Sequence, residues 1–235
     1  MKTKNYLISA FLILGACIIF TSSCKKDDPV ETETGTVTDA DGNVYKTVKI
    51  GTQTWMAENL KTTKYRNGDA IPEVTGITEW GDLTTGAYCN YDNNAANAAT
   101  YGRLYNWYAV NESRNLAPTG WHVATYEDWE TLTNYLGGFD VAGGKLKETG
   151  TAHWESPNEG ATDEVGFKAL PGGGRFFPAS HNFNAIGLGS EWWSINNTGA
   201  IKDWAWDIMS SGASIRADYF ATADTDGLSV RCVKD

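Results

Sequence analysis

The segment from Glu191 to Asp207 combines tryptophans with short polar side chains, a mixture that is suited to holding a ligand. Aromatic rings stack on the flat faces of sugars or peptides, and a few carboxylates or amides fix the orientation of the bound molecule. The residues that we expect to contact a ligand are Glu191, Asn196, Asn197, Asp203, Trp204 and Trp206. The alternative is that these tryptophans pack the core, since Trp204 and Trp206 share one face of a strand.

Motifs of known enzyme classes are missing from the sequence. The 3 histidines are His122, His153 and His181, and no HExxH, GxSxG or GxxxxGK[ST] motif accompanies them. Each histidine is therefore expected to be a packed or surface residue rather than a catalytic base. We predict that the protein is not an enzyme. The alternative is an enzyme that acts on polysaccharide or protein through a carboxylate pair among the 29 acidic residues.

One turn has part of the pattern of a calcium-binding loop. Asp39, Asp41 and Asn43 have the first three ligand spacings of an EF-hand, but Val44 replaces the required glycine and Ile50 replaces the final glutamate. Asp-Gly pairs are common in hairpin turns because glycine accepts a positive φ. We therefore predict a structural turn, no metal site and no cofactor. A calcium site built from other oxygen atoms is the alternative.

The N-terminal segment predicts a lipid anchor. Lys2 and Lys4 precede an apolar run from Tyr6 to Phe20, and small residues then lead to Cys24. A run of about 15 apolar residues is short for a membrane span but typical of a signal peptide. The order is similar to a bacterial lipoprotein signal, which implies that residues 1–23 are removed and that Cys24 carries the lipid. The alternative is a plain secreted protein in which Cys24 is incidental.

Residues 24–36 predict an acidic tether between the anchor and the folded body. Acidic residues, threonines and Pro29 dominate the segment, so it buries too little apolar surface to fold. The run KKDD directly after Cys24 is similar to the lipoprotein export signal of Bacteroidota. This resemblance implies an outer-membrane lipoprotein exposed at the cell surface. A tether that faces the periplasm is the alternative.

The remaining cysteines fit an oxidising compartment. Cys17 belongs to the predicted signal peptide, which leaves Cys89 and Cys232 in the folded body. A disulfide between them would close a loop of about 140 residues and stabilise the fold by about 4–5 kcal/mol. We predict this disulfide, and the alternative is two separately buried thiols. No CxxC pair occurs, so a zinc ribbon or a dithiol redox site is not supported.

Composition and charge limit the class of protein and partner. The 235 residues are 41% hydrophobic and 20% charged, which is typical of a folded chain rather than a disordered one. The net charge of −10 argues against a partner held through phosphate contacts. Nucleic acid is therefore excluded as a partner.

Local patterns predict one α+β domain over residues 37–235, with two helices, antiparallel sheets and a long loop region. A hairpin is expected at residues 36–38 and 44–50, and further strands at residues 86–91, 167–170, 192–195, 204–209 and 228–233. The first helix is expected to bury one face, which consists of Tyr101, Leu104, Tyr105 and Tyr108. The second begins with a capping box of Thr125 and Asp128 and buries Tyr126, Trp129, Leu132 and Leu136.

Six runs of the sequence resemble the Fibrobacter succinogenes major paralogous domain. They are Thr47 to Asp69, Gly102 to Val110, Gly120 to Leu132, Gly143 to Gly150, Gly166 to Arg175 and Gly227 to Asp235. This resemblance covers the whole predicted domain and implies a fold related to C-type lectins, with neighbouring termini. Such lectins hold calcium through Glu-Pro-Asn or Gln-Pro-Asp followed by Trp-Asn-Asp, and neither pattern occurs here. The family has no defined biochemical activity, so the resemblance does not supply a function.

These observations favour a surface-displayed lipoprotein that acts as a non-catalytic binding or adhesion module. The membrane is its partner through the lipid anchor, and a glycan or a surface or host protein is the expected ligand. Two alternatives remain, namely the carboxylate-dependent enzyme and a structural subunit of a surface assembly.

Overall fold

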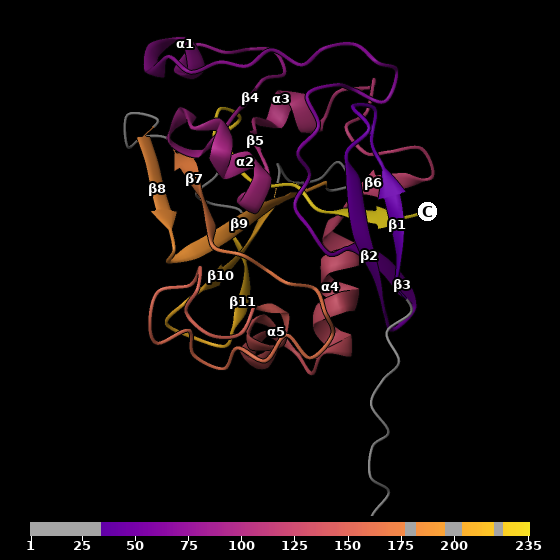
Figure 1. The fold of residues 1–235 in the computed structure, drawn as a ribbon, viewed down its shortest axis with the longest axis vertical. Helices are drawn as coiled ribbons and strands as arrows, with labels where there is room; N and C mark the ends of the chain where they lie inside the picture. Colours follow the sequence, from indigo (N-terminus) through magenta and orange to yellow (C-terminus); the bar gives the residue numbers. More distant parts are fainter. Residues whose placement is uncertain (1–33, 177–181, 196–203, 219–222) are drawn as a thin grey trace, which may run out of the picture. The chain divides into compact units, whose positions relative to one another are not determined.

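The computed structural model describes residues 34–176, 182–195, 204–218 and 223–235, apart from the side chains of residues 204 and 218. The described residues belong to one compact unit. They form strands in sheets together with five α-helices, so the predicted α+β class is confirmed. Figure 1 shows the order of these elements along the chain. Among the described residues, no helix is both long enough and apolar enough to cross a membrane.

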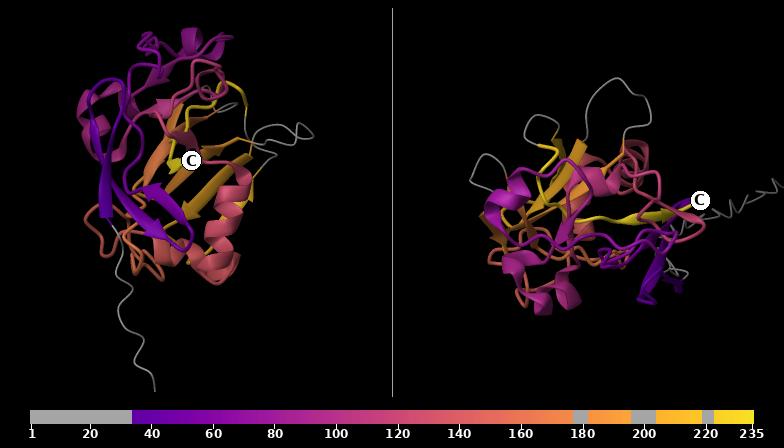
Figure 2. Two further views of the ribbon diagram at one scale, coloured as in Figure 1. Left: turned by 90° about the vertical axis from the view of Figure 1, so that its right-hand side faces the viewer. Right: turned by 90° about the horizontal axis from the view of Figure 1, so that it is seen from above.

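The first sheet contains the predicted N-terminal hairpin. Its strand order is β1-β2-β3-β12-β6, and every pair is antiparallel. The strands are β1 (Thr34–Thr38), β2 (Val44–Ile50), β3 (Gln53–Met56), β12 (Cys232–Lys234) and β6 (Trp121–Val123). The β1–β2 turn is structural, as predicted, because Asp39 Oδ1 accepts the backbone N–H groups of Asp41 and Asn43, each at 2.9 Å. The C-terminal strand thus lies inside the sheet, between β3 and β6 (Figure 2).

The second sheet is mixed rather than antiparallel throughout. Its order is β11-β10-β9-β7-β8, and the pair β7–β9 is parallel. The strands are β7 (Gly172–Phe176), β8 (Asn182–Ile186), β9 (Gly189–Ser194), β10 (Trp204–Met209) and β11 (Ile215–Asp218). A separate short pair joins β4 (Tyr88–Cys89) to β5 (Leu104–Tyr105). The strand predicted at residues 167–170 is wrong, since Ala169 makes only an isolated bridge to Lys147.

The best-signalled helix is confirmed together with its cap. It is α4 (Tyr126–Tyr135), where the Thr125 hydroxyl accepts the Asp128 N–H at 3.1 Å and the Asp128 carboxylate accepts the Thr125 N–H at 2.9 Å. Trp129, Leu132 and Leu136 are buried, as the apolar stripe predicts. The other helices are α1 (Ile77–Gly81), α2 (Ala95–Tyr101), α3 (Trp107–Val110), α5 (Phe139–Leu146) and the 3-10 helix η1 (Tyr91–Asn93).

The continuous helix predicted from Tyr101 to Tyr108 is wrong. Helix α2 ends at Tyr101 and is followed by Gly102, whose φ of +80° favours glycine. Leu104 and Tyr105 then pair with β4 as the strand β5. The Asn106 side chain accepts the Ala109 N–H at 3.0 Å and begins the separate helix α3. Pairing between distant segments therefore overrides the local helical spacing.

Helix α5 was not predicted, because its glycines suggest a loop. A Cβ atom at Gly143 would lie 2.2 Å from the carbonyl oxygen of Ser214, and one at Gly144 would lie 2.4 Å from that of Gly160. These glycines allow the helix backbone to pack directly against neighbouring backbone. The helix is therefore stabilised by this close approach of backbones as well as by Leu146, which is buried in the main core.

Tryptophans fill the main core between the two sheets and α4. Trp129 lies at its centre, with ring centroids 4.9 Å from Trp55, 5.5 Å from Trp192 and 6.0 Å from Trp206. All four side chains are fully buried. Since each buried aromatic side chain removes a large apolar area from water, this cluster is a major source of stability.

Buried cations hold the loops that surround this core. Lys147 is fully buried, and its Nζ donates to the carbonyl oxygens of Glu159, Met209 and Gly212 at 2.8, 3.0 and 2.8 Å. Burial lowers the pKa of Lys147 to about 8. Arg175 is also buried and donates to the carbonyl oxygens of residues 74–76 at 3.1–3.2 Å. Both side chains join segments that are far apart in the sequence.

Candidate functional site

The residues predicted to bind a ligand do not form one site among the described residues. Trp206 is fully buried and stacks on Phe139 with ring centroids 5.8 Å apart, so its prediction as a ligand contact is wrong and core packing is correct. Glu191 is half-buried in β9, opposite Asp207 of β10. Three further residues and one side chain lie outside the described residues, namely Asn196, Asn197, Asp203 and the side chain of Trp204.

The cysteine prediction is also corrected. Cys89 and Cys232 are free, buried thiols, so the expected disulfide is absent. The two residues belong to different hydrophobic clusters, and each is fully shielded from water. Burial raises the pKa of Cys89 to about 12 and raises that of Cys232 further. The alternative of two separately buried thiols is therefore the one that the structure shows.

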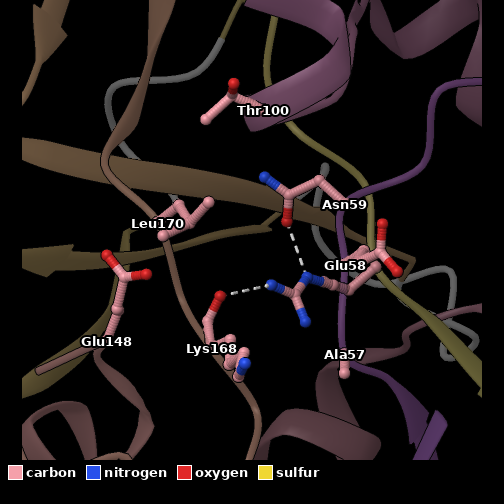
Figure 3. A pocket seen from close by; sticks show the side chains of 8 residues that line it. Ala57, Glu58, Asn59, Thr100, Glu148, Lys168 and Leu170 are labelled. Carbon is pink, nitrogen blue, oxygen red and sulfur yellow. Dashed lines mark hydrogen bonds between the residues drawn. The ribbon is translucent and has the colours of Figure 1, made fainter. Parts of the chain in front are cut away.

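A different set of residues lines a cavity of about 240 Å³ (Figure 3). The lining comes from the segment after β3, from α2, from the segment after α5, from the loop before β7 and from the residue before β12. It consists of Ala57, Glu58, Asn59, Thr100, Glu148, Lys168, Leu170 and Arg231. Figure 3 shows Glu58 and Asn59 on one side of the cavity and Glu148 and Leu170 on the other. We call this the Arg231 cavity.

The guanidinium of Arg231 is buried at this cavity and bound mainly by backbone carbonyls. Its Nη1 donates to the carbonyl oxygens of Met56 at 2.8 Å and Phe167 at 2.9 Å, and its Nη2 donates to that of Lys168 at 3.2 Å. Its Nε donates to Asn59 Oδ1 at 2.6 Å. These bonds use four of the five N–H groups of an arginine, which leaves one N–H on Nη2 with no partner in the part of the chain that the structure describes.

No carboxylate among the described residues forms an ion pair with Arg231. Burial lowers the pKa of this guanidinium to about 9, although the more distant charge of Glu58 acts in the opposite direction. The group therefore stays charged at neutral pH in a place where charge is costly. An anion that entered the cavity would compensate this charge.

Asn59 fixes the position of Arg231. Its Oδ1 accepts from Arg231 and also from Trp192 Nε1 at 2.8 Å. Its Nδ2 donates to the carbonyl oxygen of Tyr101 at 2.8 Å and to Ser229 Oγ at 3.3 Å. All four hydrogen-bonding positions of the amide are therefore used. The wall of the cavity is held in place before any ligand arrives.

The two carboxylates at the cavity already have partners elsewhere. Glu58 Oε2 lies 3.3 Å from Lys61 Nζ, and its Oε1 accepts the Lys46 N–H at 3.1 Å. Glu148 Oε2 lies 2.7 Å from Nδ1 of His153. In contrast, the ammonium of Lys168 is exposed and has no hydrogen-bond partner among the described residues. Among the charged groups at the cavity, those that can still bond to an anionic ligand are therefore the cations Arg231 and Lys168.

The other described histidine is structural. His122 Nε2 lies 2.9 Å from Asp128 Oδ2, and its Nδ1 lies 2.8 Å from Asp235 Oδ1. The hydrogen bond to Asp128 is the main reason that the pKa of His122 is raised. His181 lies outside the described residues. No group of three or more His, Cys, Asp or Glu side chains in the described part of the chain could hold a metal ion.

Sequence reasoning missed every residue of the Arg231 cavity. One signal was present, because Arg231 is a charged residue between Val230 and Cys232 in a run with buried neighbours. The other walls of the cavity come from four separate parts of the chain, and no local sequence pattern indicates that these parts lie close together.

The family model of the Fibrobacter succinogenes major domain matches residues 48–234. That range includes all the residues that line the Arg231 cavity. No curated protein and no solved structure matches the chain.

Both body cysteines are expected to resist alkylation in the folded protein, since burial limits access and suppresses the thiolate. Peptide mass spectrometry after iodoacetamide treatment at about pH 8 should find Cys89 and Cys232 unmodified without denaturant and fully modified in guanidinium. A cystine-linked peptide that joins the two residues would contradict the structure.

Proposed function

The chain belongs to the Fibrobacter succinogenes major domain family, and from this premise we propose that it is a lipid-anchored, non-catalytic binding module at the outer cell surface. Its Arg231 cavity receives the carboxylate of an acidic sugar in a surface or environmental glycan. The observation that carries the proposal is a buried guanidinium that lines a cavity and has one N–H with no partner among the described residues.

The size of the cavity favours one small unit as the ligand. Pockets for drug-sized ligands have volumes of about 300–1,000 Å³, and the volume of about 240 Å³ here lies below that range. One sugar ring that carries a carboxylate fits this size. Its hydroxyl groups would meet the Thr100 hydroxyl and the carboxylates of Glu58 and Glu148 as hydrogen-bond partners.

The charge distribution favours an anionic group on that unit. The carboxylate would accept the free N–H of Arg231 and approach the ammonium of Lys168. Repulsion from Glu58 and Glu148 is reduced, because each is already paired with a cationic or imidazole side chain. Charge-assisted hydrogen bonds are about twice as strong as neutral ones, so the carboxylate would supply much of the specificity.

One observation favours a catalytic alternative. Glu58 and Glu148 lie on opposite sides of the cavity, as the two carboxylates of a glycosidase do (Figure 3). Their existing partners favour binding over catalysis. If the wild type released reducing sugar from an acidic oligosaccharide and Glu148→Gln did not, the function would be hydrolysis rather than binding.

Removal of the exposed cation should weaken binding without disturbing the fold. In calorimetric titrations with galacturonate and glucuronate oligosaccharides, Lys168→Gln should bind about tenfold more weakly than the wild type, a loss of about 1.4 kcal/mol. Raised salt should weaken the wild type more than the variant. Lys145→Gln is the matched control and should bind as the wild type does, because Lys145 pairs with Glu164 and does not line the cavity.

Equal affinity of Lys168→Gln and the wild type for the acidic sugars would contradict the assignment of the ligand. Binding of acidic peptides alone would assign the cavity to a protein partner.

The anchor is tested separately. Labelled palmitate should enter the wild-type protein and not Cys24→Ser, which should be released from the membrane fraction. Protease added to whole cells should remove the wild-type protein if it faces outward. Survival of the protein until the outer membrane is opened would place it on the periplasmic side.

A further inference from the structure

A second cavity, of about 380 Å³, lies at helix α3 and shares no lining residue with the Arg231 cavity. Its lining includes two aromatic side chains, Trp107 and Tyr108, and three polar ones, Asn111, Glu112 and Asp224. We call this the Trp107 cavity. Its chemistry differs from that of the first, because two aromatic side chains lie beside a mainly polar lining and two of its three charged side chains are carboxylates.

The indole of Trp107 is held in place on its inner side. Its ring centroid lies 5.4 Å from that of Trp193, which is fully buried and donates its Nε1 to the carbonyl oxygen of Tyr105 at 2.7 Å. The Trp107 backbone N–H donates to the carbonyl oxygen of Asp224 at 3.0 Å. The indole itself is only half-buried, and its own Nε1 has no hydrogen-bond partner among the described residues. A rigid aromatic surface with a free donor therefore borders the cavity.

Polar groups lie next to this surface. The Tyr108 hydroxyl is 3.4 Å from Asp224 Oδ2, a long hydrogen bond at the edge of the cavity. Asn111 is exposed, and its amide has no hydrogen-bond partner within the described ranges. Glu112 Oε2 accepts from Arg114 Nη2 at 2.9 Å. Carboxylate, amide and hydroxyl groups next to an aromatic ring offer both donors and acceptors to a ligand that carries several hydroxyl groups.

The charges disfavour an anion in this place. Arg114 also lines the cavity, but it is ion-paired with Glu112 and with Asp69 and lies over the Tyr65 ring at 4.1 Å. Its charge is therefore already compensated. The lining as a whole carries the two carboxylates of Glu112 and Asp224 against the one guanidinium of Arg114, so a neutral ligand is favoured over an acidic one.

The geometry points to a second binding site in the Trp107 cavity, one for a neutral sugar unit whose apolar face stacks on the indole and whose hydroxyl groups bond to Asn111, Glu112 and Asp224. This site goes beyond the proposed function and stands independently of it, since the two cavities have no residue in common.

Calorimetric titration of the purified protein with cellotetraose, xylotetraose, mannotetraose and maltotetraose tests this site. At least one of these neutral sugars should bind and change the tryptophan fluorescence. Trp107→Ala should weaken its binding at least tenfold. Because Trp107 also packs on Trp193, the exposed Asn111→Ala is the second variant, and it should weaken binding about fivefold with an unchanged melting temperature.

Lys168→Gln is the control for the location of the ligand, and it should bind the neutral sugar as tightly as the wild type. Loss of neutral-sugar binding in Lys168→Gln would move the ligand to the Arg231 cavity and overturn the inference. Unchanged affinity in both Trp107→Ala and Asn111→Ala would overturn it as well, and so would a failure of all four sugars to bind. If the acidic sugars failed to bind and a neutral sugar did bind, only the proposed function would be overturned.

Discussion

Hydrogen bonds from buried cations to backbone carbonyl oxygens are the interaction on which the rest of this structure depends. Long stretches of the chain are neither helix nor strand, and a carbonyl group buried without a donor destabilises a fold by about 1–3 kcal/mol. Arg231, Arg175 and Lys147 supply donors to such carbonyls from inside the protein. Each cation loses its hydration in return, which is why burial lowers the pKa of Arg231 and of Lys147.

The same interaction connects the fold with the candidate site. Arg231 joins the end of β3 to the loop at residues 167–168, and Asn59 links it to Trp192 in the core. Arg231 lines the cavity, and its four bonds leave one N–H with no partner within the described ranges, so a structural group could also bind an anion. Specificity for an anion would then come from the rigid wall that holds Arg231. The exposed ammonium of Lys168 would add a second positive charge at the cavity. The Trp107 cavity has the same design, since the buried Trp193 positions the half-buried ring of Trp107.

The sequence predicted the elements whose signals are local. The hairpin at Asp39 and the capped helix α4 both follow from side chains that bond to backbone within a few residues. Helix α5 was missed because its glycines act through contacts with Ser214 and Gly160, which are distant in the chain. The predictions of a disulfide and of a ligand contact at Trp206 were wrong for the same reason. Alternation along a strand indicates which face a residue lies on, but not which residues it contacts. The residues of the Arg231 cavity come from five segments, and only the fold brings them together.

The most direct test compares two lysines that lie two residues apart. Lys147 is fully buried with three carbonyl acceptors, whereas Lys145 is partly exposed and pairs with Glu164. Denaturant unfolding at about pH 6.5 should give a free energy of unfolding about 2–4 kcal/mol lower for Lys147→Met than for the wild type, because three carbonyls lose their donor. Lys145→Met should change it by less than about 1 kcal/mol, as expected for an exposed ion pair. Equal losses in the two variants, or a Lys147→Met protein as stable as the wild type, would contradict the account.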